Sequence, residues 1–203
     1  MGRRWALAGL VVLLCGAAVG LRPAPSHGRS ATSPRREAKL SALPETCPLS
    51  APRAVVIDKS ARALGLYVEG ERVAAFPVGL GRQPQGAKLR HGDRRTPEGE
   101  YFICTRNARS RFHLFLGLSY PGIHDARRAE AEGLISGGEV AAIAEAIEAR
   151  RQPPWGTALG GAIGIHGNGA YDDWTLGCIA LDDEAVEELW AVLQVGDPVL
   201  IVP

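Results

Sequence analysis

Two residues near the end of the chain have the types and the spacing that nucleophilic catalysis needs. They are Cys178 and His166, which lie twelve positions apart. A thiol attacks carbonyl carbon as its thiolate, so a catalytic cysteine needs a base to remove its proton. Histidine binds and releases protons close to neutral pH and can be that base. The pair therefore predicts cysteine acyl chemistry, with Cys178 as nucleophile and His166 as general base and acid, if the fold brings them together.

The residues beside this pair are of types that would support it. Gly177 precedes the nucleophile, and a residue without Cβ lets backbone N–H groups come close enough to bind a developing oxyanion. Thr175 can hydrogen-bond within the same loop, although a plain turn residue is an equally good interpretation. Gly167 directly follows the histidine. We therefore expect Gly177, Gly167 and Thr175 to support the nucleophile and the oxyanion.

Cysteine and histidine also bind zinc, so a metal site is the chemical alternative. Zinc sites need three or four protein ligands, which commonly occur at short spacings. The sequence contains neither Cys-x-x-Cys nor His-x-x-x-His, and His166 with Cys178 supplies only two ligands. We expect no metal and no organic cofactor.

Length and charge narrow the class of protein. The chain has 203 residues, of which 46% are hydrophobic, and this is enough for one packed domain with a tail. Its 23 Lys and Arg nearly balance 22 Asp and Glu, so the formal net charge is +1. A chain with so little net charge has no large field that would attract a polyanion, and nucleic acid is not an expected partner.

Short apolar runs from residue 54 onward are typical of β-strands, and turn residues separate them. We expect strands at Val55–Ile57, Leu64–Val68, Val73–Val78, Tyr101–Thr105, His113–Ser119, Gly160–Ile165 and Val199–Val202. Apolar residues spaced by three and four predict a helix over Glu139–Arg151, and an acidic first turn predicts a second from Asp182 or Asp183. The domain is therefore expected to be mostly β, with mixed sheets in a sandwich- or barrel-like arrangement and two short helices.

The residues before 54 have a different composition. Arg3 and Arg4 precede an apolar run that ends in small residues, which is typical of an export signal. Residues 1–20 are expected to be a signal peptide, or an N-terminal anchor if no peptidase removes them, and the Pro/Ser/Arg-rich residues 21–53 to be a linker. The protein is thus expected in the periplasm or cell envelope, where Cys47 and Cys104 can pair or stay free.

Five motifs occur in an order that resembles the L,D-transpeptidase catalytic domain, the YkuD-like family. They are Gly92-Asp93 with Thr96-Pro97-Glu98-Gly99-x-Tyr101, then Ser119-Tyr120-Pro121, His166-Gly167, Thr175-x-Gly177-Cys178-Ile179 and Gly196-x-Pro198-Val199. The resemblance spans residues 54–203 and implies the fold of that domain.

The resemblance also implies a reaction on peptidoglycan stem peptides. In this family the cysteine attacks the carbonyl of a diaminopimelate residue, and an acyl-enzyme thioester forms as the terminal D-alanine leaves. Transfer to an amine makes a 3,3 crosslink or anchors an envelope lipoprotein, whereas transfer to water makes the protein an L,D-carboxypeptidase or amidase. A non-catalytic peptidoglycan-binding module is the alternative from another class.

Two positions depart from the pattern of this family. Leu176 stands where the family usually has histidine, and Ala180 stands where it usually has an arginine that can pair with a substrate carboxylate. Arg111 and His113 are therefore candidates for substrate binding, although a half-exposed strand histidine needs no function. Trp174 is a third candidate, which either shapes the groove or packs beneath the loop.

Overall fold

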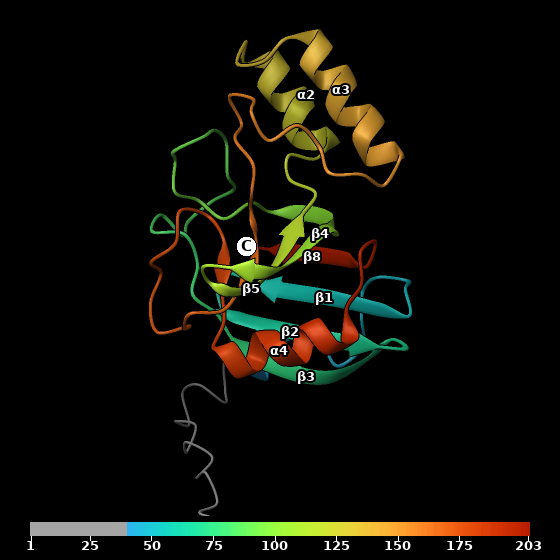
Figure 1. Ribbon diagram of the computed structural model, residues 1–203, viewed down its shortest axis with the longest axis vertical. Helices are drawn as coiled ribbons and strands as arrows, with labels where there is room; N and C mark the ends of the chain where they lie inside the picture. The colour runs from blue at the N-terminus through green and yellow to red at the C-terminus, as the bar shows by residue number, and fades with distance from the viewer. Residues whose placement is uncertain (1–39) are drawn as a thin grey trace, which may run out of the picture. The chain divides into compact units, whose positions relative to one another are not determined.

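The computed structural model describes residues 40–203, and a curled sheet dominates this part of the chain (Figure 1). In chain order the elements are β1 (Arg53–Asp58), β2 (Ala63–Val68), β3 (Glu71–Pro77), β4 (Gly99–Ser110), β5 (His113–Leu118), α2 (Ile123–Ala131), α3 (Gly137–Glu148), β6 (Gly164–His166), β7 (Ile179–Ala180), α4 (Asp183–Val192) and β8 (Pro198–Val202). The mostly β fold class predicted from the sequence is confirmed. Helices α3 and α4 lie where the sequence predicts them, whereas α2 corrects the expectation of only two helices.

The strands form one mixed sheet in the order β3-β2-β1-β8-β4-β5-β6-β7. Strand β4 links its two halves, because its first residues pair with β8 and its later residues pair with β5. Just after β3, Gly79 forms an isolated bridge to Ala180 in β7, and Gly81 forms one to Thr175. The chain that leaves one edge of the sheet therefore contacts the other edge, and this closure holds the segment around Cys178 from both sides.

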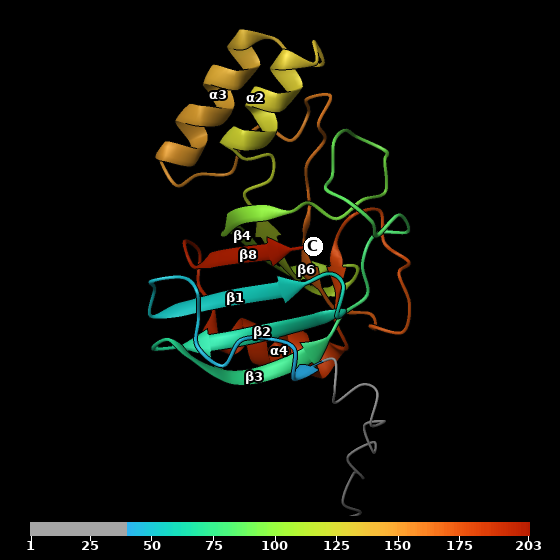
Figure 2. The ribbon, with the colours of Figure 1, turned by 180° about the vertical axis from the view of Figure 1, so that it is seen from behind.

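The inner face of the sheet is apolar and carries α4. The fully buried side chains of this core include Val55, Ile57, Leu64, Ile103, Leu116, Ile165, Ile179 and Ile201. Helix α4 lies across one face of the sheet and adds Val186 and Leu189 to the same core (Figures 1 and 2). Burial of these side chains is the main stabilising contribution to the fold.

Helices α2 and α3 follow each other between β5 and β6 and lie side by side (Figures 1 and 2). Ala126 and Ala129 of α2 and Ile143 of α3 share a small apolar cluster of their own. Helix α3 begins at a capping box in which Ser136 accepts the Glu139 N–H at 3.3 Å and donates its own N–H to the Glu139 carboxylate at 2.8 Å. The two helices thus contribute to an apolar cluster that is separate from the main core.

A buried carboxylate attaches α2 to the sheet. Asp125 accepts the hydroxyl of Tyr101, from β4, at 3.0 Å and the N–H of Gly122 at 2.9 Å. Burial raises the pKa of Asp125, although the Gly122 and Tyr101 hydrogen bonds and the Arg128 guanidinium lower it. The start of α2 is therefore fixed by a polar contact with the sheet.

Residues 40–52, which the sequence assigns to the linker, pack against the face of the sheet opposite α4 (Figure 2). Leu43 is buried with Ala54, Val56 and Tyr67, which alternate along their strands with the residues of the main core. The Tyr67 hydroxyl donates to the carbonyl of Pro44 at 2.6 Å. This segment is therefore a strap across the sheet, and we call it the N-terminal strap.

The expected export signal and residues 21–39 of the expected linker lie outside the described residues. Within residues 40–203, no helix combines the length and the apolar character that a membrane crossing requires.

Candidate active site

The pairing of β6 with β7 places the expected nucleophile and base on one face of the sheet. In this parallel pair Ile165 lies opposite Ile179. Cys178 directly precedes β7 and continues its register beside Gly164 of β6. Because side chains alternate along extended chain, Cys178 and His166 project to the same side. Both side chains line one cavity. The structure therefore brings the two residues to a common site.

His166 is buried and held in one orientation. Its Nδ1 lies 2.7 Å from the carbonyl oxygen of Gly167, the right distance for Nδ1–H to donate. The ring of Phe112 stacks on the imidazole with centroids 4.6 Å apart, and Trp174 meets it edge-on at 5.6 Å. With Nδ1 donating, Nε2 has the free lone pair and can act as a base. Burial lowers the pKa of His166, which the hydrogen bond to Gly167 partly offsets, so the ring is neutral at pH 7.

The thiol of Cys178 is also neutral at pH 7. Burial raises the pKa of Cys178 to about 11, against the smaller opposing effects of a hydrogen bond from the Gly164 backbone and of the Lys88 ammonium. The sulfur lies 3.6 Å from the carbonyl oxygen of Ala162, to which the thiol donates. A thiol in this state needs a base at the moment of attack, and His166 Nε2 is suited to that role.

Thr175 fixes the turn that carries the nucleophile. Its side chain is buried, and its Oγ1 accepts the Gly177 N–H at 3.0 Å while donating to the Cys178 carbonyl at 2.8 Å. The hydroxyl thus bridges both residues of the Gly-Cys step. Because Gly177 N–H is already bonded to Thr175, Gly177 supports the site through its conformation rather than by donating to a substrate.

The two glycines of the site leave room for close contacts, and Gly177 is also required by its backbone conformation. Gly177 has φ of 137°, and a Cβ there would lie 2.7 Å from the carbonyl oxygen of Arg95. A Cβ on Gly167 would lie 2.3 Å from Oδ1 of Asp183, in the first turn of α4. Gly167 also provides the carbonyl that orients His166. Both glycines allow approaches that any side chain would block.

The nucleophile loop is tied to the segment that follows β3. Thr175 N–H donates to the Leu80 carbonyl at 3.1 Å. The Asp173 carboxylate accepts the Leu80 N–H at 2.9 Å and pairs with the Arg62 guanidinium at 2.8 Å. Asp173 therefore fixes the loop and makes its contacts away from the His166 imidazole.

A cavity of about 810 Å³ opens over the cysteine and the histidine. The residues that line it are Lys88, His91, Gly92, Arg94, Asn107, Arg109, Ser110, Arg111, Phe112, Phe115, Gly161, Ala162, Ile163, His166, Trp174, Leu176 and Cys178. Of the expected substrate-binding residues, Arg111 and Trp174 are among them. His113 is not, because its Nε2 lies 2.7 Å from the Glu187 carboxylate of α4. The structure therefore places His113 in a contact with α4, outside the residues that line this cavity.

The two departures from the family pattern have different surroundings. Leu176 is 68% exposed and lies at the cavity. Ala180 is fully buried, and its backbone exchanges two hydrogen bonds with Gly79, at 2.8 and 2.9 Å. An arginine at position 180 would have to displace this packing. Any charge that binds substrate must therefore come from elsewhere in the cavity.

Such charges are present, on residues that the sequence analysis did not nominate. Lys88, Arg94 and Arg109 line the cavity together with Arg111. Lys88 and Arg94 belong to the long loop before β4, and Arg109 lies near the end of β4. The only signal for them in the sequence is that basic residues cluster in the two segments beside the family motifs. Sequence spacing does not show that the two segments meet at one cavity.

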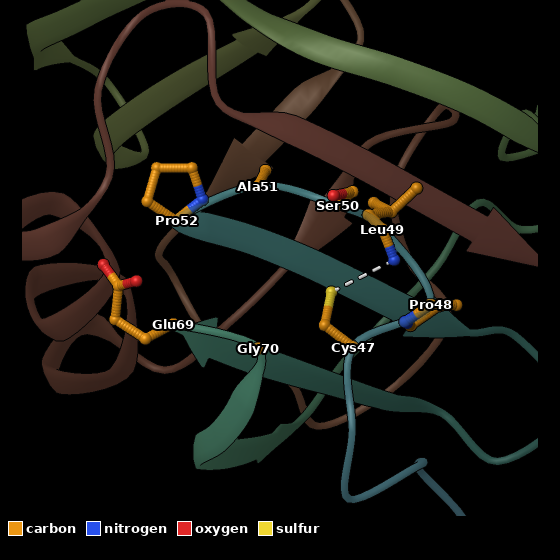
Figure 3. Close-up of a pocket in the computed structure, with 8 residues that line it drawn as sticks. All are labelled: Cys47, Pro48, Leu49, Ser50, Ala51, Pro52, Glu69 and Gly70. Carbon is orange, nitrogen blue, oxygen red and sulfur yellow. Dashed lines mark hydrogen bonds between the residues drawn. The ribbon is translucent and has the colours of Figure 1, made fainter.

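A second hollow of about 560 Å³ lies between the later part of the N-terminal strap and the β2–β3 turn (Figure 3). Its lining residues are Cys47, Pro48, Leu49, Ser50, Ala51, Pro52, Glu69 and Gly70. The Leu49 N–H donates to the Cys47 sulfur at 3.4 Å, and Glu69 projects from the β2–β3 turn. The lining contains no histidine, and its one ionisable partner for the thiol is the Glu69 carboxylate.

The described part of the chain contains three cysteines, none of which is in a disulfide. Within residues 40–203, Cys47, Cys104 and Cys178 are all free thiols. Burial raises the pKa of Cys104 to about 12. In the same range no group of three or more His, Cys, Asp or Glu side chains is placed to hold a metal ion.

Comparison with known proteins identifies the family. The L,D-transpeptidase catalytic domain, YkuD, matches residues 52–201, and the chain therefore belongs to this family. The resemblance seen in the sequence motifs is confirmed. No curated protein matches the chain.

Solved structures share the fold at low sequence identity. The helical cell shape determining protein Pgp2 from Campylobacter jejuni has a TM-score of 0.53 and 19% identity, over 82% of this chain and 54% of that one. An L,D-transpeptidase from Stackebrandtia nassauensis has a TM-score of 0.51 and 12% identity, over 83% of this chain and 65% of that one. The chain thus spans about half the length of the Campylobacter protein, and the likeness concerns the fold.

Proposed function

We propose that this chain is an L,D-transpeptidase that acts on peptidoglycan stem peptides through a thioester on Cys178. The observation that carries the proposal is that Cys178 and His166 project from adjacent strands into one cavity, in a chain of this family. The substrate class places the protein in the cell envelope, and we propose that residues 1–20 direct its export.

In the first half of the reaction, the thiol gives its proton to His166 Nε2 as the sulfur attacks the diaminopimelate carbonyl. Because the Gly177 N–H is already bonded to Thr175, we assign the stabilisation of the oxyanion to the backbone N–H of Cys178. The C–N bond then breaks, the amine of D-alanine takes the proton from His166, and a thioester remains on Cys178.

In the second half, an acceptor amine attacks the thioester carbonyl and gives a proton to His166. The C–S bond breaks, the sulfur takes that proton, and the product is a 3,3 crosslink or a peptide bound to the lysine of an envelope lipoprotein. The Gly167 carbonyl supports both halves, because it keeps Nδ1 protonated and Nε2 directed at the reaction.

Hydrolysis of the thioester, an L,D-carboxypeptidase activity, is the second candidate. It is favoured by the charge of the cavity, because no Asp or Glu is among the residues described as lining it. An acceptor ammonium would find no carboxylate there to pair with, whereas water needs none. Analysis of products from a tetrapeptide muropeptide separates the two, because crosslinked dimers indicate transfer and tripeptides alone indicate hydrolysis.

Intact-protein mass spectrometry after incubation with the tetrapeptide muropeptide tests the acyl-enzyme. The wild type should gain the mass of the peptide minus D-alanine, and Cys178→Ala should gain nothing. Cys47→Ala is the matched control, since it removes another free thiol but leaves the cavity intact, and it should acylate like the wild type. A folded wild type that binds the peptide without a covalent adduct would be a non-catalytic module.

A further inference from the structure

The cavity over Cys178 has an uneven distribution of charge. Its lining includes Lys88, Arg94, Arg109 and Arg111, and no acidic residue described there opposes them. The chain as a whole is almost neutral, with a net charge of +1. Positive charge is therefore concentrated at the cavity that holds Cys178 and His166.

Only part of this charge is neutralised within the protein. Lys88 is 3% exposed and pairs with Asp93 at 2.7 Å. By contrast, Arg94, Arg109 and Arg111 form no ion pair with any residue in the range 40–203. Arginines elsewhere in the same range, such as Arg62, do have carboxylate partners. The unpaired guanidinium groups are available to an external anion.

Arg111 is also linked to the catalytic base through packing. Its guanidinium lies 4.8 Å from the centre of the Phe112 ring, and Phe112 stacks on His166 at 4.6 Å. Arg109 precedes it by two residues at the end of the β4–β5 hairpin, and Arg94 comes from the loop before β4. Two separate segments thus bring like charges to one cavity, which repel each other until an anion neutralises them.

We propose that Arg94, Arg109 and Arg111, which we call the arginine rim, bind the free carboxylates of the acyl donor and select donors that carry them. The inference rests on the proposed function. A tetrapeptide stem has carboxylates on its γ-linked D-glutamate, on the distal centre of diaminopimelate and on its terminal D-alanine. Guanidinium groups bind such carboxylates through paired N–H donors, and a carboxamide of the same shape lacks the charge.

The test compares acylation of Cys178 by two tetrapeptides with the same sequence. One has free carboxylates, and the other has carboxamides on D-glutamate and diaminopimelate. The wild type should acylate faster with the free form by roughly tenfold for each interaction lost, as expected for hydrogen bonds to charged groups. Arg109→Gln and Arg111→Gln should each reduce this preference, mainly through a higher KM, and Arg94→Gln should do the same.

Two controls distinguish an effect of the arginine rim on donor binding from a general loss of Cys178 reactivity. Arg127→Gln removes an exposed arginine of α2, outside the cavity, and should keep the full preference. Alkylation of Cys178 by neutral iodoacetamide should be the same in all rim variants, which shows that the nucleophile is intact. Equal wild-type rates with both peptides, or an unchanged preference in the rim variants, overturns the arginine rim. Absence of an adduct with either peptide would instead overturn the proposed function.

Discussion

The hydroxyl of Thr175 offers the sharpest test of how the nucleophile is positioned. Thr175→Val keeps the shape of the side chain but removes both the acceptor for Gly177 N–H and the donor to the Cys178 carbonyl. Each lost hydrogen bond costs about 0.5–1.5 kcal/mol, and a buried group left unsatisfied costs about 1–3 kcal/mol. Because Gly177 is buried, we expect the variant to lose about 2–4 kcal/mol of unfolding free energy.

Thr175→Ser is the matched control, because serine keeps the hydroxyl and loses only a methyl group, for about 1 kcal/mol. Urea denaturation measures both variants, and acylation of Cys178 by the tetrapeptide is followed by mass spectrometry. The rate of Cys178 acylation in the valine variant should be well below that in the serine variant, since the Gly-Cys turn loses both hydrogen bonds to residue 175. Equal stability and equal acylation of the two variants would refute this account of Thr175.

Three further predictions follow from the structure. Because burial raises the pKa of Cys178 to about 11, its alkylation should increase with pH through the alkaline range, and a plateau already reached at pH 8 in peptide-mapped alkylation would contradict the neutral thiol. Gly167→Ala should cost about 1–3 kcal/mol in urea denaturation, since the new Cβ meets the Asp183 carboxylate, and Asp183→Ala added to it should cost less than the sum of the two single changes. Burial raises the pKa of Asp125 above 3.8, so its contribution to stability is present below that pH and is lost as the pH rises through the folded-state pKa. Asp125→Asn should remove this part of the pH dependence, and unfolding free energies that keep the wild-type slope above pH 3.8 would show that Asp125 does not cause it.

Much of the sheet could be predicted from sequence because its strands are short apolar runs between turns. Helix α3 could also be predicted, since its apolar residues recur at helical spacing and Ser136 caps it. Helix α2 was not, because the face that it buries consists of Ala126, Ala129 and the charged Asp125, which give no apolar stripe. The signal for α2 lies in tertiary contacts with Tyr101, and these have no counterpart in local sequence.

The residues of the candidate site, too, could be predicted from the sequence only in part. Cys178 and His166 could be proposed because their types, their neighbours and the family motifs occur close together in the chain. Arg94 and Arg109 could not, since Arg94 lies in the loop before β4 and Arg109 near the end of β4, and their meeting at one cavity depends on how the sheet curls. The contact of His113 could not be predicted either, because its partner Glu187 lies 74 residues away on α4. Proximity in space, which sequence spacing does not encode here, decides these assignments.

The N-terminal strap has a practical consequence for anyone who wishes to produce the domain. The family match begins at residue 52, which invites an expression fragment that starts there. Such a fragment would omit Leu43 and Pro44, and it would expose the apolar side chains of Val56 and Tyr67 on the outer face of the sheet. Exposed apolar surface on strands promotes association between copies. A fragment that begins at or before residue 40 keeps that face covered and is the better choice for crystallisation and for kinetic work.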